Sequence, residues 1–204
     1  MSFNKLIIPF LLISTFFISM FIFSCETPTK LHSWIDSTYN GGYINNILVM
    51  AIVKDLEYRT AYENEVVNQL SERDIHSVQS LKILSPTKTY SEEDFDTILT
   101  QNKLESIIFI KYLGTEVEKV DNKGKTFYKY YKKTLKSTFR SGYYEIHRTV
   151  IVEISLFTAN NGKIIWSATA KTTNAIDVND LANSLAKEII KNLEEKKLIK
   201  PKIK

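Results

Sequence analysis

The chain has 204 residues, of which 44% are hydrophobic, 12% aromatic and 25% charged, with 27 Lys and Arg against 23 Asp and Glu. This average apolar and charged content excludes a disordered chain, a collagen-like chain and a membrane protein with many spans. The length fits one domain with short appendages, since domains commonly hold about 100–200 residues. The single cysteine excludes an internal disulfide framework and every metal motif that needs two cysteines.

The first 24 residues have the pattern of an export signal. Lys5 precedes an apolar run over residues 6–23. The run is longer than the apolar core of most signal peptides, about 7–15 residues, and shorter than a membrane-spanning helix of about 20 residues. The only cysteine, Cys25, follows directly after the tripeptide Ile-Phe-Ser at 22–24. This cysteine at the end of the run is the feature that decides what the segment is.

Residues 22–25 resemble the lipobox of bacterial lipoproteins. In that family a lipid is attached to the cysteine thiol, the preceding peptide is cut away, and the new amino group is usually acylated. Ile22 and Ser24 match the family pattern, whereas Phe23 stands where a small residue is usual. The resemblance implies a signal peptide over 1–24 and acyl chains such as palmitate on Cys25. An uncleaved signal anchor with a free thiol and an ordinary signal peptide are the alternatives.

Acylation of Cys25 would hold the mature chain on a lipid bilayer. Each buried CH₂ contributes about 0.8 kcal/mol, and two acyl chains anchor a protein stably. We expect residues 25–45 to form the lipidated cysteine and its tether, and the chain to be anchored in the bacterial cell envelope. Glu26 is not the aspartate that resembles an inner-membrane retention signal. In a Gram-negative cell we therefore expect the periplasmic face of the outer membrane.

Residues 46–198 are expected to form one folded domain, whose first half mixes strands with helices. Strands buried on both faces are expected at 46–54 and 106–112. Between them, an amphipathic helix is expected at 59–74 and a short alternating strand at 74–78. Ser91 and Asp94 have the spacing of a capping box at the start of a further short helix. A helix between two neighbouring strands implies that the strands are parallel.

The second half of the domain predicts a hairpin followed by a helix. Strands are expected at 149–158 and 163–173, joined by Asn161 and Gly162 in a type I′ turn, because both residues tolerate positive φ. Asp177 is expected to begin the last helix. The residues expected to face the core are Ile164, Trp166, Ala168 and Ala170 from the strand, and Val178, Leu181, Leu185, Ile189 and Leu193 from the helix. The lysine-rich tail 199–204 is expected to be frayed.

The element order predicts an α/β fold in a single domain. A mixed sheet of about five or six strands with about three helices, in two or three layers, accounts for the patterns. This arrangement resembles that of small bacterial envelope lipoproteins, and more loosely the amino-terminal domain of TolB and the lipoprotein LpoB. The resemblance implies an envelope domain that works through protein contacts. The residues that carry it are Cys25, Trp34, Ile47 to Val53, Arg59, Tyr62, Glu63, Leu70, Trp166 and Ser167.

The segment 123–148 is rich in basic and aromatic residues. Such a mixture can bind an anionic lipid surface, an anionic envelope polymer or an envelope protein, and it can equally be a long hairpin or loop that lysines keep soluble. Basic and aromatic residues also bind nucleic acid, but an exported lipoprotein meets little of it, so no nucleic-acid partner is expected. The residues proposed for this surface are Lys129, Tyr130, Tyr131, Lys132, Lys133, Lys136 and Arg140.

Three further residues are singled out by the family resemblance. Arg59 and Glu63 lie one helical turn apart, where an exposed pair contributes only a few tenths of a kcal/mol. Their match to the family pattern favours a buried or partner-facing role, and we include both in the candidate interaction surface. Trp34 is expected to cover the first strand of the domain rather than to lie loose in the tether.

The sequence offers little support for catalysis. His32, His76 and His147 are far apart and form no metal-ligand pair, and the glycines form neither a nucleophile elbow nor a phosphate loop. We therefore expect no metal, no cofactor and no catalytic residues. The predicted function is a membrane-anchored envelope lipoprotein that acts as a non-catalytic interaction or assembly module. The alternative is a periplasmic domain that binds a small ligand or glycan, with a concealed hydrolase activity.

Overall fold

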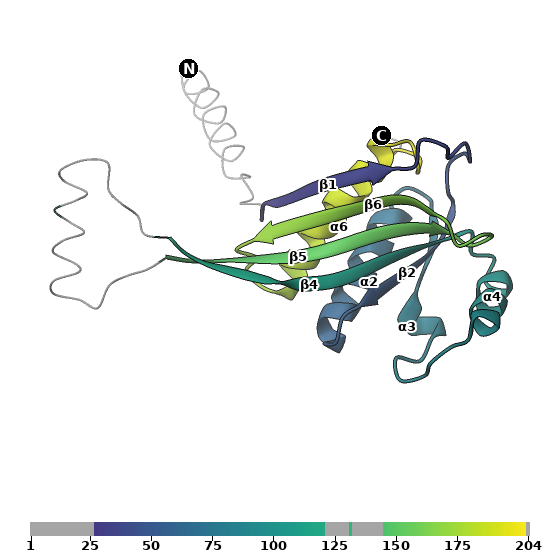
Figure 1. Cartoon of the computed structure of the whole chain (residues 1–204), viewed down its shortest axis with the longest axis horizontal. Helices are drawn as coiled ribbons and strands as arrows, with labels where there is room; N and C mark the ends of the chain where they lie inside the picture. Colours follow the sequence, from purple (N-terminus) through teal and green to yellow (C-terminus); the bar gives the residue numbers. More distant parts are fainter. Residues whose placement is uncertain (1–26, 121–130, 132–144, 203–204) are drawn as a thin grey trace, which may run out of the picture.

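The structure is a computed structural model that describes residues 27–120, 131 and 145–202. Within these residues one sheet of six strands and four helices form a single α/β domain (Figure 1). The strands are β1 (Thr29–Ile35), β2 (Asn46–Ile52), β3 (His76–Gln79), β4 (Ser106–Val120), β5 (Glu145–Thr158) and β6 (Ile164–Thr173). The helices are α2 (Leu56–Ser71), α3 (Ser80–Ile83), α4 (Glu92–Gln101) and α6 (Val178–Glu195).

The sheet is mixed, in the order β1-β6-β5-β4-β2-β3. β2 lies parallel to both β3 and β4, whereas the pairs β4–β5, β5–β6 and β6–β1 are antiparallel. The expected fold class and the parallel pairing around the first helix are therefore confirmed. β4 and β5 continue as a two-stranded arm beyond the end of β6 (Figure 1), and residues 145–148 of this arm belong to the segment 123–148, for which a long hairpin was one of the expectations.

The helix starts follow the capping patterns of the sequence. The Ser91 hydroxyl accepts a hydrogen bond from the Asp94 amide at 3.1 Å, and the Asp94 carboxylate accepts one from the Ser91 amide, so the capping box before α4 is confirmed. Asp177 caps α6 by accepting a hydrogen bond from the Asp180 amide at 2.8 Å. Asp55 does the same for α2, with the Glu57 amide as donor.

One face of the sheet is covered by α2 and α6 and holds the main core. Its buried side chains come from every second residue of the strands and from one stripe of each helix, as the periodicity predicts. The largest of them include Ile47, Tyr62, Leu70, Ile108, Ile154, Leu156, Trp166, Leu185 and Ile189. The Trp166 indole also donates a hydrogen bond to Asn192 of α6 at 3.0 Å.

The opposite face is covered only over part of its area. A second, smaller cluster is built from Leu48, Met50, Leu84, Leu99, Leu104 and Ile107. Beside it the rings of Phe109 and Phe157 meet edge to face, with centroids 5.4 Å apart. Farther along the sheet, the side chains of Thr169 and Lys171 on this face are exposed to solvent. The two faces of one sheet therefore differ strongly in how far they are buried.

Two segments differ from the sequence-based expectation at the ends of the domain. The range 25–45, expected as the lipidated cysteine and tether, contains an ordered edge strand, because β1 pairs with β6 along its full length. Trp34 on this strand is 56% exposed, so it does not cover the first strand of the core. The tail is not frayed at its start: Ile199 is fully buried, and Lys202 bonds to Glu72 at 2.7 Å.

The hairpin between β5 and β6 is confirmed, but its expected turn is wrong. Gly162 has φ of 63°, whereas Asn161 is not among the residues with positive φ, so the two do not form a type I′ turn. The strand pairing also slips, with Phe157 opposite Ile164 and Leu156 opposite Trp166. This irregularity leaves Ile164 exposed on the surface and keeps Trp166, Ala168 and Ala170 in the core. The β6–α6 stripe is otherwise confirmed, although Val178 is only half-buried.

In the part of the chain that the structure describes, no helix combines the length and the apolar content needed to cross a membrane.

Candidate functional site

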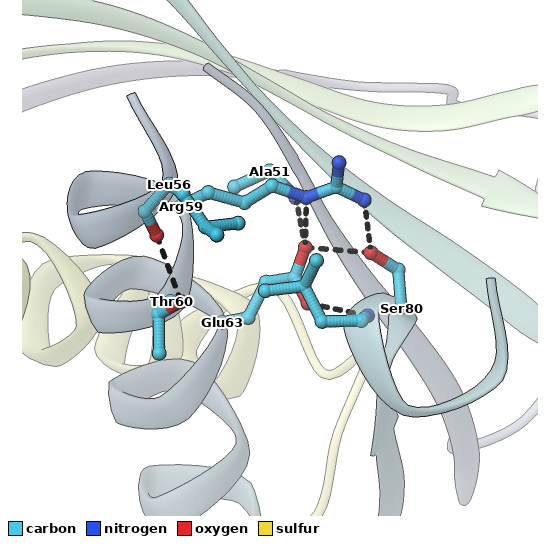
Figure 2. A network of polar contacts seen from close by, with 7 residues as sticks. Ala51, Leu56, Arg59, Thr60, Glu63 and Ser80 are labelled. Carbon is cyan, nitrogen blue, oxygen red and sulfur yellow. Dashed lines mark hydrogen bonds and ion pairs between the residues drawn. The ribbon is translucent and has the colours of Figure 1, made fainter. Parts of the chain in front are cut away.

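A fully buried carboxylate, Glu63 of α2, joins three elements at the carboxyl end of β2 (Figure 2). Its Oε1 accepts hydrogen bonds from the Ala51 amide at 3.0 Å, from Arg59 Nε at 3.1 Å and from the Ser80 hydroxyl at 2.6 Å. Its Oε2 accepts one from the Leu81 amide at 3.1 Å. We call these five residues the Glu63 network.

The Glu63 network also fixes the guanidinium of Arg59. Nε bonds to Glu63, and Nη2 bonds to the Ser80 hydroxyl at 2.8 Å. The third nitrogen, Nη1, makes no hydrogen bond to the described part of the chain and points away from the network in Figure 2. Both oxygens of Glu63 accept hydrogen bonds from donors of this chain and the side chain is 1% exposed, so the carboxylate positions its neighbours. Arg59 in contrast keeps a donor for an outside group.

Exposed apolar side chains lie at the same end of the sheet as this arginine, on both faces of the sheet. Ile52 ends β2 and pairs with Lys111 of β4, and the next two residues of β4 are apolar as well. A shallow hollow of about 340 Å³ lies beside them and is lined by residues 50–54 and Arg59. We call the exposed apolar group the Arg59 patch: Ile52, Leu56, Tyr58, Tyr112 and Leu113, which are between 38% and 57% exposed.

The composition of the Arg59 patch is that of a protein-binding surface. Tyrosine and arginine are enriched at the centres of interfaces, and an arginine held in one orientation loses little entropy when it binds. Tyr58 packs against Tyr62 of the core with ring centroids 6.4 Å apart, which holds its position. Burial, together with the nearby Tyr58 and Tyr112, raises the pKa of Tyr62, so this phenol stays neutral.

A cleft of about 730 Å³ lies at the opposite end of the sheet, where β2 and β4 begin. Tyr39, Asp96 and Glu105 line it together with Ser106. Ser106 is 1% exposed, and its hydroxyl has no hydrogen-bond partner among the described residues. Buried hydroxyls are nearly always hydrogen-bonded, and this one stands in the wall of the cleft without a partner among the described residues.

The amino-terminal end of the domain is held by α6. Thr27 is 8% exposed. Its hydroxyl donates a hydrogen bond to Asp180 Oδ2, and its carbonyl accepts one from the Ser184 hydroxyl at 2.6 Å. The hydrogen bond from Thr27, followed by that from the Ile176 amide, lowers the pKa of Asp180. Thr27, two residues after Cys25 in the sequence, is thus held by α6.

The residues expected for the site are distributed over different parts of the molecule. Arg59 and Glu63 are brought together in the Glu63 network, with Glu63 buried and the Arg59 side chain 15% exposed. Tyr131 is 53% exposed. Cys25 lies outside the described residues, and so do Lys129, Tyr130, Lys132, Lys133, Lys136 and Arg140.

The three histidines are not gathered into one site. They lie on β1, β3 and β5, and β1 and β3 form opposite edges of the sheet. His32 and His76 are exposed to solvent. Within the described ranges, no three His, Cys, Asp or Glu side chains lie close enough together to hold a metal ion.

Sequence reasoning missed two parts of the candidate site. Ser80 lies 17 residues from Glu63, and no local motif connects them. Leu113 was placed beyond the end of an expected strand, whereas β4 continues to Val120 through an irregularity in register after Tyr112. The sequence signal that remained was the presence of apolar residues outside the alternating pattern of the core, such as Ile52 at the end of β2 and Leu113 within β4.

No family model and no curated protein matches the chain. Among solved structures, PelC from Paraburkholderia phytofirmans, described as a dodecamer, is 13% identical at a TM-score of 0.49, covering 81% of this chain and 97% of PelC. Lipoprotein GNA1162 from Neisseria meningitidis is 12% identical at a TM-score of 0.42, covering 74% and 99% of the two chains. The LpoB C-terminal domain from Salmonella enterica is 11% identical at a TM-score of 0.35, covering 65% and 85%. The solved structures similar to this chain thus include lipoproteins, and LpoB, whose likeness the element order suggested, is among them.

Proposed function

We propose that this protein is a lipid-anchored lipoprotein of the bacterial envelope whose domain binds another envelope component without catalysing a reaction. Acylated Cys25 holds the chain on the bilayer, at the periplasmic face of the outer membrane in a Gram-negative cell. The Arg59 patch binds the partner, for which we propose an envelope protein with an apolar surface and a carboxylate. The basic-aromatic segment 123–148 remains a predicted second contact for an anionic envelope polymer.

The observation that carries this proposal is the group of exposed apolar side chains at the end of the sheet where the Glu63 network holds Arg59. Arg59 Nη1 is free to bind a carboxylate, and a second charge-assisted hydrogen bond at this planar group adds specificity. Ile52 lines the hollow beside Arg59 and is 55% exposed, and Leu113 on the neighbouring strand β4 is 49% exposed. Burying such side chains against a partner contributes about 25 cal/mol per Å² of apolar area before the cost of association.

The position of the Arg59 patch leaves space for a partner above the membrane. Ile52 pairs with Lys111, Lys111 with Glu153 and Glu153 with Thr169, so Ile52 lies at the level of Thr169 in β6. Thr169 comes three residues before Thr172, which pairs with Thr29 at the start of β1. Three residues of strand correspond to about 10 Å. Ile52 is therefore set back from the end at which the anchor enters the domain, whereas Tyr112 lies one residue closer to it, at the level of Ala170.

In-cell photocrosslinking tests the proposed binding surface. A photoreactive amino acid at Ile52 should give one defined adduct, whereas the same group at the exposed Thr169 should not. Leu113→Asp should abolish the adduct at position 52 without a change in the amount of folded protein, because Leu113 is a surface residue. Equal crosslinking at both positions, or an adduct that survives Leu113→Asp, would contradict the proposal.

Lipidation is tested separately on the mature protein. Metabolic labelling with a palmitate analogue should mark the chain, and Cys25→Ser should remove the label and release the protein from membranes. Mass measurement should show a chain that begins at residue 25 with its acyl chains. An intact amino terminus with an unmodified thiol would contradict the proposed anchor.

The cleft with the unpartnered Ser106 hydroxyl favours a second candidate, a domain that binds a small polar ligand or glycan. Soluble peptidoglycan fragments are a suitable probe. If the cleft binds them, amide resonances of Glu105 and Ala159 should shift in a saturable way, and Ser106→Ala should weaken the effect. No shift at these positions at millimolar fragment would remove this candidate.

A further inference from the structure

The distance between the anchor and the folded domain is fixed by the chain itself. Thr27 is already buried and bonded to α6, so only Glu26 separates it from Cys25. Two residues of chain span at most about 7 Å. If Cys25 carries lipid, as proposed above, the end of the domain around Thr27 lies against the bilayer surface. A folded partner domain, about 25 Å across, does not fit into this space.

The most exposed large apolar side chain of the described residues lies at this same end. Ile176, in the loop between β6 and α6, is 85% exposed. Its amide donates a hydrogen bond at 2.9 Å to Asp180 Oδ2, the same oxygen that accepts the Thr27 hydroxyl. One carboxylate oxygen therefore connects Ile176 directly to the residue that leads to the anchor.

The loop that carries Ile176 is fixed on its other side by the arm of β4 and β5. The Asn174 amide donates to the Arg148 carbonyl at 2.8 Å, and the Asn174 side chain accepts from the Arg148 amide at 2.9 Å. Asn174 has φ of 55°, a left-handed conformation that asparagine tolerates. These bonds hold the loop in one conformation, so the exposure of Ile176 follows from its position in the fold.

The arm adds two more exposed apolar side chains at this end. The arm begins where β6 ends, because Thr149 pairs with Thr173, and Val117 and Ile146 lie on it with 59% and 51% of their surfaces exposed. They are diagonal neighbours, since Val117 pairs with Arg148, and diagonal pairs lie about 7–8 Å apart. By strand alternation both share the face of Arg148, and Glu116 and Glu118 lie on the opposite face.

We infer that Ile176, Val117 and Ile146 form a membrane seat, a surface that rests on the bilayer beside the lipidated cysteine. The inference depends on the proposed anchoring of Cys25. Apolar side chains at the interface enter the headgroup boundary by about 5–10 Å. Arg148 lies on the same face of the arm and suits the anionic headgroups of bacterial lipids. The seat fixes the orientation of the domain, and with it the height of the Arg59 patch above the bilayer.

Fluorescence quenching of the natural lipidated protein tests the membrane seat. Ile176→Cys provides a single free thiol, because Cys25 is acylated, and it is labelled with a polarity-sensitive dye. In vesicles of phosphatidylethanolamine and phosphatidylglycerol, nitroxide lipids should quench this dye and shift its emission to the blue. The matched control is Ile164→Cys, a 39% exposed isoleucine at the start of β6 at the opposite end of the sheet, which should remain accessible only to aqueous iodide.

A second variant tests whether the apolar residues act together. Ile176→Asp should leave the protein anchored and folded, and should reduce the lipid quenching of a dye at Ile146→Cys. Equal iodide access at positions 176 and 164 on acylated protein would overturn the membrane seat but leave the anchor intact. Protection of position 176 in cells but not in lipid vesicles would indicate a protein cover and would also overturn it. An unmodified Cys25 would overturn the anchor and the seat together.

Discussion

The two faces of the sheet are built from the same strands, yet only one of them is closed. On the face covered by α2 and α6, side chains such as Trp166 and Leu185 are buried at 0% and 1% exposure. On the other face the buried cluster is confined to the region near α3 and α4, and Thr169 and Lys171 point into solvent. The closed face supplies most of the apolar burial that stabilises the fold. The open face and the strand ends are left for contacts with other molecules.

The largest effect is expected where the closed face meets the Arg59 patch. Glu63→Ala removes the acceptor of the Ala51 and Leu81 amides and leaves the guanidinium of Arg59, whose side chain is 15% exposed, without its partner. Breaking a buried ion pair costs about 3–5 kcal/mol. Urea denaturation should show a loss of this size in the free energy of unfolding. Glu57→Ala, an exposed change in the first turn of the same helix, should cost about 0.3–1 kcal/mol.

If Glu63→Ala and Glu57→Ala are equally mild, the Glu63 network does not stabilise the junction. The Arg59 patch would then have to be regarded as a surface without a fixed arginine, and the proposed partner contact would lose its main support.

A matched pair of leucines compares the two faces directly. Leu185 lies in the main core at 1% exposure, and Leu99 lies in the smaller cluster at 5% exposure. Leucine-to-alanine changes in cores cost about 2–5 kcal/mol, with larger values where the surroundings cannot collapse. We expect Leu185→Ala near the upper end of this range and Leu99→Ala near the lower end, because Leu99 also borders the cleft. Chemical denaturation measures both, and equal losses would mean that the two faces contribute equally.

The smallest effect concerns the rim of the sheet, outside both clusters. A hydrogen bond and ion pair with Lys163, together with bonds from Thr38, lower the pKa of Asp36 from 3.8 to about 2. A carboxyl group whose pKa is lowered on folding stabilises the folded state at pH values above its ordinary pKa of 3.8. This contribution is lost as the pH falls from 3.8 towards about 2. Asp36→Asn should therefore make thermal stability less dependent on pH in this window. Lys163→Met should have the same effect, and an unchanged slope in both variants would exclude the pair as its source.

The candidate site was predictable only where its members are close in sequence. Arg59 and Glu63 were selected as a pair one turn apart, and the structure places them in a single network. The weak surface pair that the sequence alone suggests becomes a buried one, because Ser80 and the Ala51 amide approach from other elements. Nothing in the local sequence specifies these two contacts.

The strand β1 shows the same limit at the level of the fold. Its seven residues alternate between half-buried and exposed, a weak pattern that is compatible with a tether. Its place in the sheet is set by pairing with β6, from Thr29 opposite Thr172 to Ile35 opposite Trp166. That pairing in turn brings Thr27 to Asp180 and so decides how close the domain lies to Cys25.

The sequence by itself determined the buried strands, the caps of α4 and α6 and the inward stripe of α6, because these depend on periodicity and on hydrogen bonds between residues a few positions apart. Only the tertiary structure decided the edge strand β1, the Glu63 network and the position of Ile176 beside Thr27. Apart from the Arg59–Glu63 pair, the contacts between elements that build these features join residues 12 to 153 positions apart. Contacts at such separations follow from the packing of whole elements and leave no local pattern in the sequence.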